Sequence, residues 1–433
     1  MRTIFHSDLN AFYASVEEIL HPEYKKIPMA VCGDPASRRG IILAKNELAK
    51  KAGVKTAETI WQAKQKCKNL KLAPPHRDLY YYYYEKINAI YEEYTEQVER
   101  CGIDESFLDV TGSLNLFKKT PLELAHEIRI RAEKELGLTV SIGVSWNKIF
   151  AKLGSDYKKP NAVTIFDKNN WQELIFPLPA SDMLMVGKRT AEALQKMAIF
   201  TIGDLAKADE NKLVQNFGKL GEVLHICANG LDDSPVANKD ENEAVQSVGN
   251  GLTFKRNLIS ESDIKTALLA LSDSVARRMR KQGVKCRVVQ ITIKNPELKS
   301  ITRQKQIAKS TNISDVLANE ASQLLQTSWQ IGKPIRMLTV TAQHLVSENE
   351  AEAETSDVAT NFRQLSLFDL PKETQKSNKT EKTFDTKSDA KKEKLEFALD
   401  NIREKYGVDV IERASVAKND FGLQSGKYNY DSD

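Results

Sequence analysis

Three acidic residues give the clearest chemical signal in the sequence. Asp104 and Glu105 are adjacent within the segment Gly102–Asp109, and Asp8 ends an apolar run that begins at Ile4. Carboxylates at strand ends suit Mg²⁺, which prefers hard oxygen ligands. Two such ions, roughly 3.5 to 4 Å apart, can activate one oxygen and stabilise the departing one in phosphoryl transfer. The three acids therefore predict metal-dependent nucleotidyl transfer.

The elements that must position these acids are alternating strands and helices in the first 166 residues. Short apolar runs favour buried strands, and longer runs with helical periodicity favour helices. The expected strands are Ile4–His6, Pro28–Cys32, Gly40–Ala44, Phe107–Val110 and Thr139–Val144, and the expected helices are Asp78–Glu99 and Pro121–Leu136. This pattern predicts a mixed α/β domain.

A mainly helical segment follows, from about Asp167 to Asn238. Within it, Met183–Leu194 and Ile199–Leu205 have the pattern of two helices joined by a hairpin at about Gly187. Glycine lets backbone N–H groups approach a phosphate closely, and a helix N-terminus adds a partial positive charge. The segment predicts a phosphate contact.

The third segment, about 244 to 346, has the order strand, helix, strand, strand, helix, strand. Helical spacing of apolar residues marks Glu261–Gln282, and Val288–Lys294 alternates as a half-buried strand. Basic residues are frequent here, and they fit either a nucleic-acid surface or a solvated charged face equally well. They are Arg277, Arg278, Arg280, Lys281, Lys285, Arg287, Lys294, Lys299, Arg303, Lys305 and Lys309.

From about Ser347 the composition becomes polar and charged, which predicts a flexible tail over 347–433. Two apolar islands interrupt this tail. One is Gln364–Phe368, and the other has the helical spacing Leu395, Leu399, Ile402 and Tyr406. The second island predicts a short amphipathic helix that either binds another protein or docks back onto this chain.

Composition narrows the class of protein. The chain has 433 residues, 41% of them hydrophobic, which is enough for two to four domains with proper cores. The net charge is only +4, so a polyanionic partner must be met by a local basic surface. Five scattered cysteines and no apolar stretch of about 18 residues predict a soluble, cytoplasmic protein without a membrane span.

Taken together, the motifs over residues 1 to 346 resemble the Y-family of DNA polymerases, the bacterial translesion enzymes of the DinB and UmuC type. The resemblance is carried by Asp8–Glu17, Ile103–Thr111 and Ser141–Lys152, continuing to Lys159-Pro160. It implies a right-hand polymerase, an α/β (α+β) multidomain fold. Its expected parts are palm and fingers in 1–166 (fingers about 19–76), a helical thumb in 167–238, a βαββαβ little finger in 244–346 and a disordered tail.

The resemblance also implies roles for individual residues. Asp8, Asp104 and Glu105 would bind two Mg²⁺ ions together with the backbone carbonyl of Leu9, and Tyr13 would be the steric gate that rejects ribonucleotides. Lys50 and Lys159 would bind the triphosphate of a deoxynucleoside triphosphate. Glu47 and Asn10 depart from the family pattern, which more often has tyrosine and aspartate at these positions.

The implied partners are primer-template DNA and a sliding clamp, with the polymerase a monomer. The resemblance places DNA contacts at Gly187, Lys188, Arg287 and Arg303. The clamp peptide would be Gln364, Leu365, Leu367 and Phe368 in the segment 364–368. Small fingers and the lack of a recognisable proofreading domain imply low-fidelity, low-processivity synthesis past damaged bases in DNA repair.

Two other functions fit part of the sequence. A nucleotide cyclase also places acids at strand ends of a palm-like fold, but it has no use for the Gly187 hairpin or the basic third segment. A non-catalytic, clamp-tethered DNA-binding protein would require the acids to be incidental, since an isolated Asp-Glu pair is more often part of a solvated loop.

Overall fold

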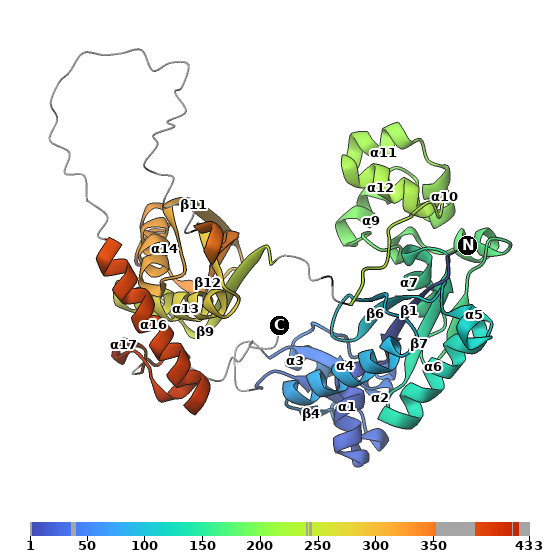
Figure 1. Ribbon diagram of the computed structural model, residues 1–433, viewed down its shortest axis with the longest axis horizontal. Helices are drawn as coiled ribbons and strands as arrows, with labels where there is room; N and C mark the ends of the chain where they lie inside the picture. The colour runs from blue at the N-terminus through green and yellow to red at the C-terminus, as the bar shows by residue number, and fades with distance from the viewer. Residues whose placement is uncertain are drawn as a thin grey trace, which may run out of the picture. The chain divides into compact units, whose positions relative to one another are not determined.

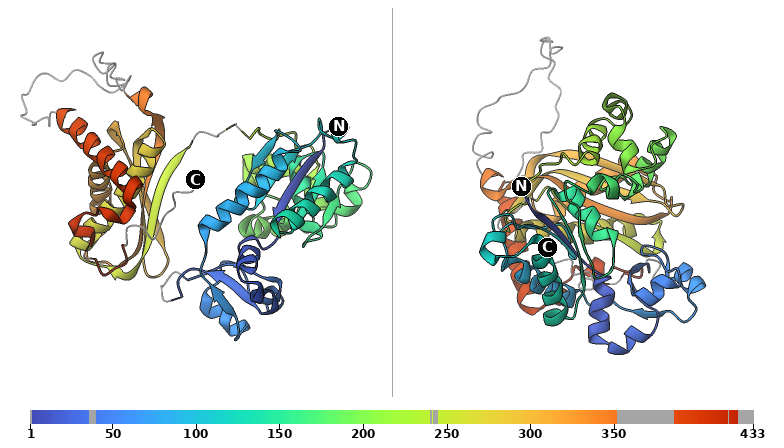
Figure 2. Two further views of the ribbon diagram at one scale, coloured as in Figure 1. Left: turned by 60° about the horizontal axis from the view of Figure 1, so that its bottom comes forward. Right: turned by 90° about the vertical axis from the view of Figure 1, so that its right-hand side faces the viewer.

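The computed structural model describes residues 2–35, 40–239, 241, 245–351, 386–417 and 419–423. It divides into two compact units, Met1–Asn242 and Glu243–Asp433. Figures 1 and 2 show that each unit combines helices with β-sheet. No helix in the described ranges combines the length and the hydrophobicity that a bilayer crossing requires.

The first unit is organised around a five-stranded sheet. Its order is β5-β6-β1-β7-β8, so β1 lies at the centre. β1 is antiparallel to both of its neighbours, and β8 is parallel to β7. The strands are β1 Ile4–Leu9, β5 Val98–Arg100, β6 Glu105–Asp109, β7 Val140–Ser145 and β8 Val163–Ile165. All six residues of β1 are buried, including the polar His6, Ser7 and Asp8, which agrees with the central position of this strand.

Helices cover both faces of this sheet. Phe5 packs with α4 (Arg77–Glu92) and α6 (Pro121–Leu136), whereas Ile4, pointing the opposite way, packs with Ala151 of α7 (Lys148–Tyr157). Helix α7 packs directly against β7 at Gly143. A Cβ added at this glycine would be only 1.8 Å from the carbonyl oxygen of Ala151, so only glycine allows this close approach. A short helix, α5 (Leu114–Phe117), follows β6. The predicted α/β arrangement is confirmed for this part of the chain.

A smaller, three-stranded sheet follows β1 in the chain. Its order is β3-β2-β4, with β2 antiparallel to β3 and parallel to β4. The elements are α1 Phe12–Leu20, η1 Pro22–Lys26, β2 Met29–Cys32, β3 Ile42–Lys45, α2 Glu47–Lys51, α3 Ile60–Lys66 and β4 Lys71–Ala73.

The helical segment that closes the first unit has a core that includes Leu194, Leu205, Leu213 and Leu224, and it shares this core with Phe150 of α7. The elements are α8 Trp171–Ile175, η2 Ala180–Asp182, α9 Lys188–Lys196, α10 Ile202–Lys207, α11 Glu210–Phe217 and α12 Lys219–Ala228. The two helices of the predicted hairpin are present as α9 and α10. The first begins at Lys188 rather than Met183.

The second unit has a four-stranded antiparallel sheet in the order β11-β10-β12-β9. The helices α13 and α14 pack against the apolar side of this sheet. The elements are β9 Ser247–Leu258, α13 Glu261–Lys281, β10 Val284–Lys294, β11 Ser300–Thr311, α14 Ser314–Ser328 and β12 Ile335–Ser347. This is the predicted order of strand, helix, strand, strand, helix, strand.

The C-terminal residues that the structure describes belong to the second unit, which corrects the expected flexible tail for 386–417 and 419–423. They form α16 Thr386–Tyr406, η3 Val408–Val410 and α17 Ala414–Ala417. Phe421 and Leu423 enter the core of the unit, and Phe421 contacts the ring of Phe254. Figures 1 and 2 show α16, in red, beside the other helices of the unit.

Helix α16 docks through charged residues rather than through its apolar ones. Glu396 and Arg403 are buried, whereas Leu395 and Tyr406 are about 60% exposed. Glu396 accepts hydrogen bonds from Arg280 and from the backbone N–H of Ser314. The predicted amphipathic spacing therefore marks a helix that docks back onto the chain, but by a different face from the apolar one.

Candidate active site

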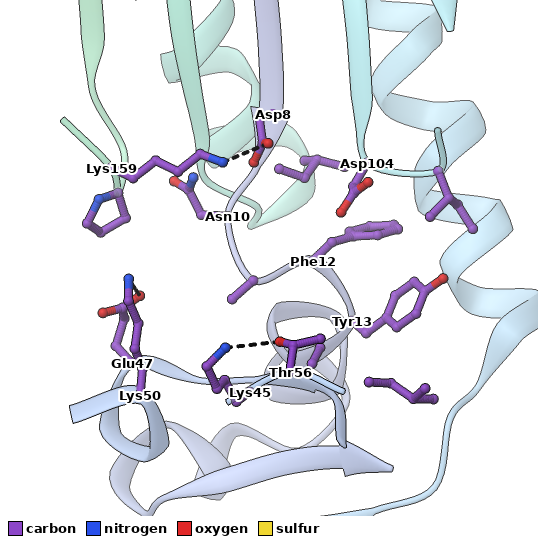
Figure 3. Close-up of a pocket in the computed structure, with 16 residues that line it drawn as sticks. Asp8, Asn10, Phe12, Tyr13, Lys45, Glu47, Lys50, Thr56, Asp104 and Lys159 are labelled. Carbon is purple, nitrogen blue, oxygen red and sulfur yellow. Dashed lines mark hydrogen bonds and ion pairs between the residues drawn. The ribbon is translucent and has the colours of Figure 1, made fainter. Parts of the chain in front are cut away.

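The three predicted acids lie together at one end of the central strands. The antiparallel register places Asp8 directly opposite Glu105, and the backbone N–H of Leu9 donates to the carbonyl of Asp104 at 2.9 Å. Asp8 and Asp104 line a pocket of about 450 Å³. Figure 3 shows both carboxylates pointing into the pocket from the end of the large sheet, opposite residues of the small sheet. Strand pairing thus brings positions 8 and 104–105 into one site.

Two lysines of α7 and the turn after it neutralise two of these acids. The Lys159 ammonium is 2.7 Å from the Asp8 carboxylate and 2.7 Å from Asp156. Lys152 is 2.8 Å from Glu105. Lysine presents a compact charge on a flexible stem, so these pairs can exchange partners more easily than a bidentate arginine pair.

The carboxyl groups have different electrostatic surroundings. Burial raises the pKa of Asp8 to about 7, although Lys159 opposes this shift. Burial also raises the pKa of Asp104. The contact with His6 and the ammonium of Lys152 hold the pKa of Glu105 well below its usual range. The protein alone therefore stabilises Glu105 as an anion but leaves charge on Asp8 and Asp104 costly.

His6 is a site residue that the sequence did not single out. Its side chain is completely buried, Nδ1 lies 2.8 Å from the Ser155 hydroxyl, and Nε2 lies 3.5 Å from a Glu105 oxygen without a hydrogen-bond partner. Burial lowers the pKa of this imidazole. Alternation along β1 from Asp8 to His6 was the available signal, because residues two apart share a face.

The candidate ligands are carboxylate oxygens, which are the type of ligand that a divalent cation such as Mg²⁺ prefers. Asp8 and Asp104 line the pocket, and Glu105 lies opposite Asp8 in the strand pairing. Their charges repel one another where burial weakens solvation, which a cation would relieve. Within the described ranges, no three acidic, histidine or cysteine side chains are already arranged to hold an ion. Asp8 and Glu105 are instead paired with lysines in this structure.

Tyr13 lines the same pocket from α1. Its ring stacks on Tyr80 with centroids 4.1 Å apart and an interplanar angle of 10°. The residue before α1, Ala11, has a left-handed backbone with φ 48°, which turns the chain sharply between β1 and the helix. Tyr80 is buried and bonded to Glu17, so the surface behind the Tyr13 ring is rigid.

The small sheet brings further charges to the pocket. Lys50 and Glu47 of α2 form an ion pair of 3.2 Å. Lys45 of β3, which the sequence analysis did not single out, donates to the Thr56 hydroxyl at 3.0 Å. Lys159 lies on the opposite side of the pocket from these residues (Figure 3). The pocket therefore combines three lysines with the acid cluster, which suits an anionic ligand that brings a cation.

Asn10 is buried and forms only neutral hydrogen bonds. Its amide nitrogen lies 2.9 Å from the Ser141 hydroxyl, and its carbonyl oxygen accepts from the backbone N–H of Asn161 at 2.7 Å. These contacts tie the end of β1 to β7 and to the turn that carries Lys159. Asn10, which departs from the family pattern, therefore supports neighbouring parts of the site and adds no charge to it.

Gly187 and Lys188 lie at the start of α9. Gly187 is the N-cap residue and provides no side-chain hydrogen bond to the first turn. Lys188 is 91% exposed at its side chain, and Glu192 is 4.0 Å away. Gly187 also lines a second pocket together with Lys152 and Asp156 of α7. The helix N-terminus is thus accessible to a phosphate group.

The basic residues that were predicted to contact DNA in the second unit differ in their position on the sheet and in their burial. Arg303 lies opposite Ile291 in the β10–β11 pairing, and Ile291 is buried under the helices, so Arg303 lies on the helix-covered face at an edge strand. Arg287 lies at an irregularity in β10. Arg280 is buried and paired, which removes it from the predicted basic surface. The clamp peptide, Gln364–Phe368, lies outside the described residues.

Comparison with known proteins identifies the family of this chain. Residues 7–156 match the model of the impB/mucB/samB family, and residues 245–356 match that of its C-terminal domain. The chain belongs to the impB/mucB/samB family. It is 43% identical to DNA polymerase IV of Acetivibrio thermocellus, over 98% of this chain and 99% of the relative. It is 33% identical to DNA polymerase IV 1 of Bacillus subtilis, over 98% of this chain and 95% of the relative.

A solved structure supports the fold. A Y-family DNA polymerase chimera of Dbh and Dpo4 superposes with a TM-score of 0.69 at 24% identity, and the match covers 80% of this chain and 99% of the chimera. Together with the family match, this confirms the expected membership of the bacterial Y-family polymerases. The predicted fold class is confirmed with it.

Proposed function

We propose that this chain is a translesion DNA polymerase that adds deoxynucleotides to a primer 3′ end by two-metal phosphoryl transfer. The observation that carries the proposal is the pocket in which Asp8 and Asp104 face Tyr13, Lys45 and Lys50. Membership of a family whose relatives are DNA polymerases IV supports the same reaction. The reaction requires positioning and charge stabilisation more than covalent chemistry by the protein.

The carboxylates of Asp8, Asp104 and Glu105 and the backbone carbonyl of Leu9 would hold two Mg²⁺ ions. When bound, the ions supply charge neutralisation at the transferred phosphorus and activate the attacking 3′ oxygen. Lys152 and Lys159 hold two of the carboxylates in place, and bound cations would compete with them for these oxygens. His6 orients Glu105 from the buried side of the strand.

The other pocket residues would bind and select the nucleotide. Lys159 and Lys50 attract the triphosphate, and the Tyr13 ring packs under the sugar so that a 2′-hydroxyl collides with it. The tight stack on Tyr80 supports this role, because the ring cannot swing away from the added oxygen. Glu47 reduces the charge that Lys50 presents.

The remaining parts would bind primer-template DNA. The five-stranded sheet is the palm, the three-stranded sheet with α2 and α3 the fingers, and the helical segment with Gly187 and Lys188 the thumb. The second unit is the little finger. Its basic residues, the half-buried Arg287 and the exposed Arg303 among them, would contribute sequence-independent contacts to the DNA backbone. Gln364–Phe368 would bind a sliding clamp and so raise the local concentration of a monomeric, cytoplasmic enzyme at the primer end.

Primer extension tests the proposal. The wild-type chain with Mg²⁺ and the four deoxynucleoside triphosphates should extend a primer according to the template and continue past a damaged base. Asp104→Ala should abolish extension while leaving DNA binding largely intact. Retained synthesis in that variant would refute the assignment of the acids. Cyclisation of a nucleoside triphosphate without template would instead support the cyclase alternative.

A further inference from the structure

The fingers carry a concentration of positive charge that the whole chain does not. Residues 19–76 contain twelve Lys and Arg against four Asp and Glu, a net charge of +8. The other 375 residues contain 51 basic and 55 acidic residues, a net charge of −4. A small subdomain with this excess attracts a polyanion, and at physiological salt the attraction acts over about 8 Å.

An exposed tryptophan lies within this basic region. Trp61 is 70% exposed in the first turn of α3. No ring contact or hydrogen bond joins its indole to another side chain in the ranges that the structure describes. Lys64 follows three residues later and so lies on the same face of the helix. An indole that a fold leaves uncovered offers an apolar face of considerable area to a partner.

Several lysines around α3 are also available. Lys51, Lys64 and Lys68 are exposed and form no ion pair within the described part of the chain. Lys66 is different, because it pairs with Glu58. An accessible aromatic ring among unpaired cations is the pattern that binds single-stranded nucleic acid, since bases stack on the ring and lysines follow the backbone.

The start of α3 lies near residues of the nucleotide pocket. Leu43 of β3 and Thr56 line the pocket. The backbone pairs Ile41 with Thr59, and the N–H of Ile60 donates to the carbonyl of Gly40, so the start of α3 is held against the start of β3. Trp61 is five positions after Thr56 in the chain, a span of at most about 18 Å. That span corresponds to about five stacked bases.

We propose that Trp61 and Lys64 form a stacking platform for the unpaired template strand ahead of the primer end. The platform holds the strand between one and about five nucleotides from the templating base. It rests on the proposed polymerase function, and its occupant is single-stranded DNA of any sequence, because stacking uses the face that all bases share. The consequence is a template that enters the pocket in a fixed direction even where the templating base is damaged.

Templates of different overhang length test this proposal in the full-length chain. One template has a single unpaired nucleotide, and the other has fifteen. Trp61→Ala should lower affinity for the long-overhang DNA about five- to tenfold and change affinity for the short-overhang DNA less than twofold. Trp61→Phe, which keeps a ring, should retain at least half of the wild-type affinity for the long overhang.

A matched control separates stacking from a general loss of apolar surface. Leu116 of α5 is 78% exposed outside the fingers, and Leu116→Ala should bind both templates as the wild type does. Equal affinity of Trp61→Ala and wild type for both templates would overturn the proposal. An equal loss on both templates would overturn it as well, since the overhang would then be irrelevant. Failure of the wild type to extend either primer would instead refute the polymerase function itself.

Fluorescence gives an independent measurement. An oligothymidylate of fifteen nucleotides should quench part of the tryptophan fluorescence of the wild type. Trp61→Phe should not show this quenching. Lys64→Ala should leave the quenching at saturation intact but weaken binding two- to threefold and reduce its dependence on salt. Identical quenching in the wild type and Trp61→Phe would contradict a base stacked on this indole.

Discussion

Two clusters of close ion pairs, one in each unit, use the same kinds of charge for different purposes. In the first unit Asp8 is paired with Lys159 at a pocket, and Glu105 beside Asp8 is paired with Lys152. In the second unit Arg280 is paired with Glu396 and Asp400 between α13 and α16. Both clusters connect elements that are far apart in the sequence.

The clusters differ in burial and in the completeness of their hydrogen bonding. The Arg280 side chain is only 2% exposed, and it also donates to the carbonyl of Asn312 at 2.8 Å. The Lys159 side chain is 28% exposed and lies at the pocket wall. A planar guanidinium with several fixed partners holds two helices together, whereas an ammonium at an accessible pocket can leave its partner.

The cluster around Arg280 stabilises the fold, whereas the cluster around Asp8 belongs to the candidate active site. Burial raises the pKa of Asp8 to about 7, so its charge opposes folding rather than supporting it. Burial raises the pKa of Glu396 as well, although it receives hydrogen bonds from Ser314 and Arg280. The two places differ in the partner left behind, because removing Glu396 would leave a buried guanidinium, whereas the Lys159 side chain beside Asp8 is 28% exposed. Removing the acid should therefore cost more stability at Glu396 than at Asp8.

The largest expected effect is at Asp8. Asp8→Asn keeps the shape of the side chain but removes a metal ligand, and we expect primer extension to fall at least about a thousandfold. The thermal unfolding temperature should not decrease, because the substitution removes a buried charge. Asp156→Asn is the control, since it removes only the other acid bonded to Lys159, and it should cost less than about tenfold. A large loss of stability in Asp8→Asn would break the contrast.

The second prediction concerns the cluster in the second unit. Glu396→Ala leaves Arg280 buried with one acid fewer, and we expect a loss of about 3 kcal/mol in the unfolding free energy of this unit. Glu404→Ala, an exposed change on the same helix, should cost less than about 0.5 kcal/mol. Chemical denaturation measures both variants. Similar values for the two would show that α16 does not stabilise the unit.

The third prediction tests the rigid aromatic wall of the pocket. Tyr13→Ala should raise ribonucleotide incorporation relative to deoxynucleotide incorporation, roughly tenfold to a hundredfold, because the 2′-hydroxyl no longer meets a ring. Tyr13→Phe keeps the stack on Tyr80 and should leave the ratio within about twofold. Single-nucleotide incorporation gives the ratio directly, and an unchanged ratio in Tyr13→Ala would exclude the steric gate.

The smallest expected effect is at the exposed pair on α2. Glu47→Gln releases Lys50 from its ion pair, and we expect the KM for deoxynucleoside triphosphate to fall about twofold, because exposed pairs are weak. Glu222→Gln, an exposed acid on α12, should leave the KM unchanged. A rise in the KM of Glu47→Gln would show that Glu47 assists nucleotide binding instead of weakening it.

Some elements were predictable because their signals are local. The helix predicted at Pro121–Leu136 has those bounds in the structure, since Thr120 and Glu123 form a capping box and Gly137 ends the helix with a left-handed backbone. The helix predicted over Asp78–Glu99 instead ends at Glu92, because Val98–Arg100 pairs with β6 as a strand. Strand pairing is a tertiary interaction that residue periodicity does not encode.

The residues of the candidate site also divide into those that the sequence indicated and those that only the structure revealed. The sequence by itself indicated the acids at positions 8, 104 and 105 through their residue type and order, and it indicated the aromatic at 13 and the cationic residue at 159 through the resemblance to the family. Only the tertiary structure decided that His6, Lys45 and Lys152 join them. It also decided that α16 docks through Glu396 and leaves Leu395 exposed. The physical reason is that the contacts of a charged or aromatic side chain depend on which distant elements pack beside it.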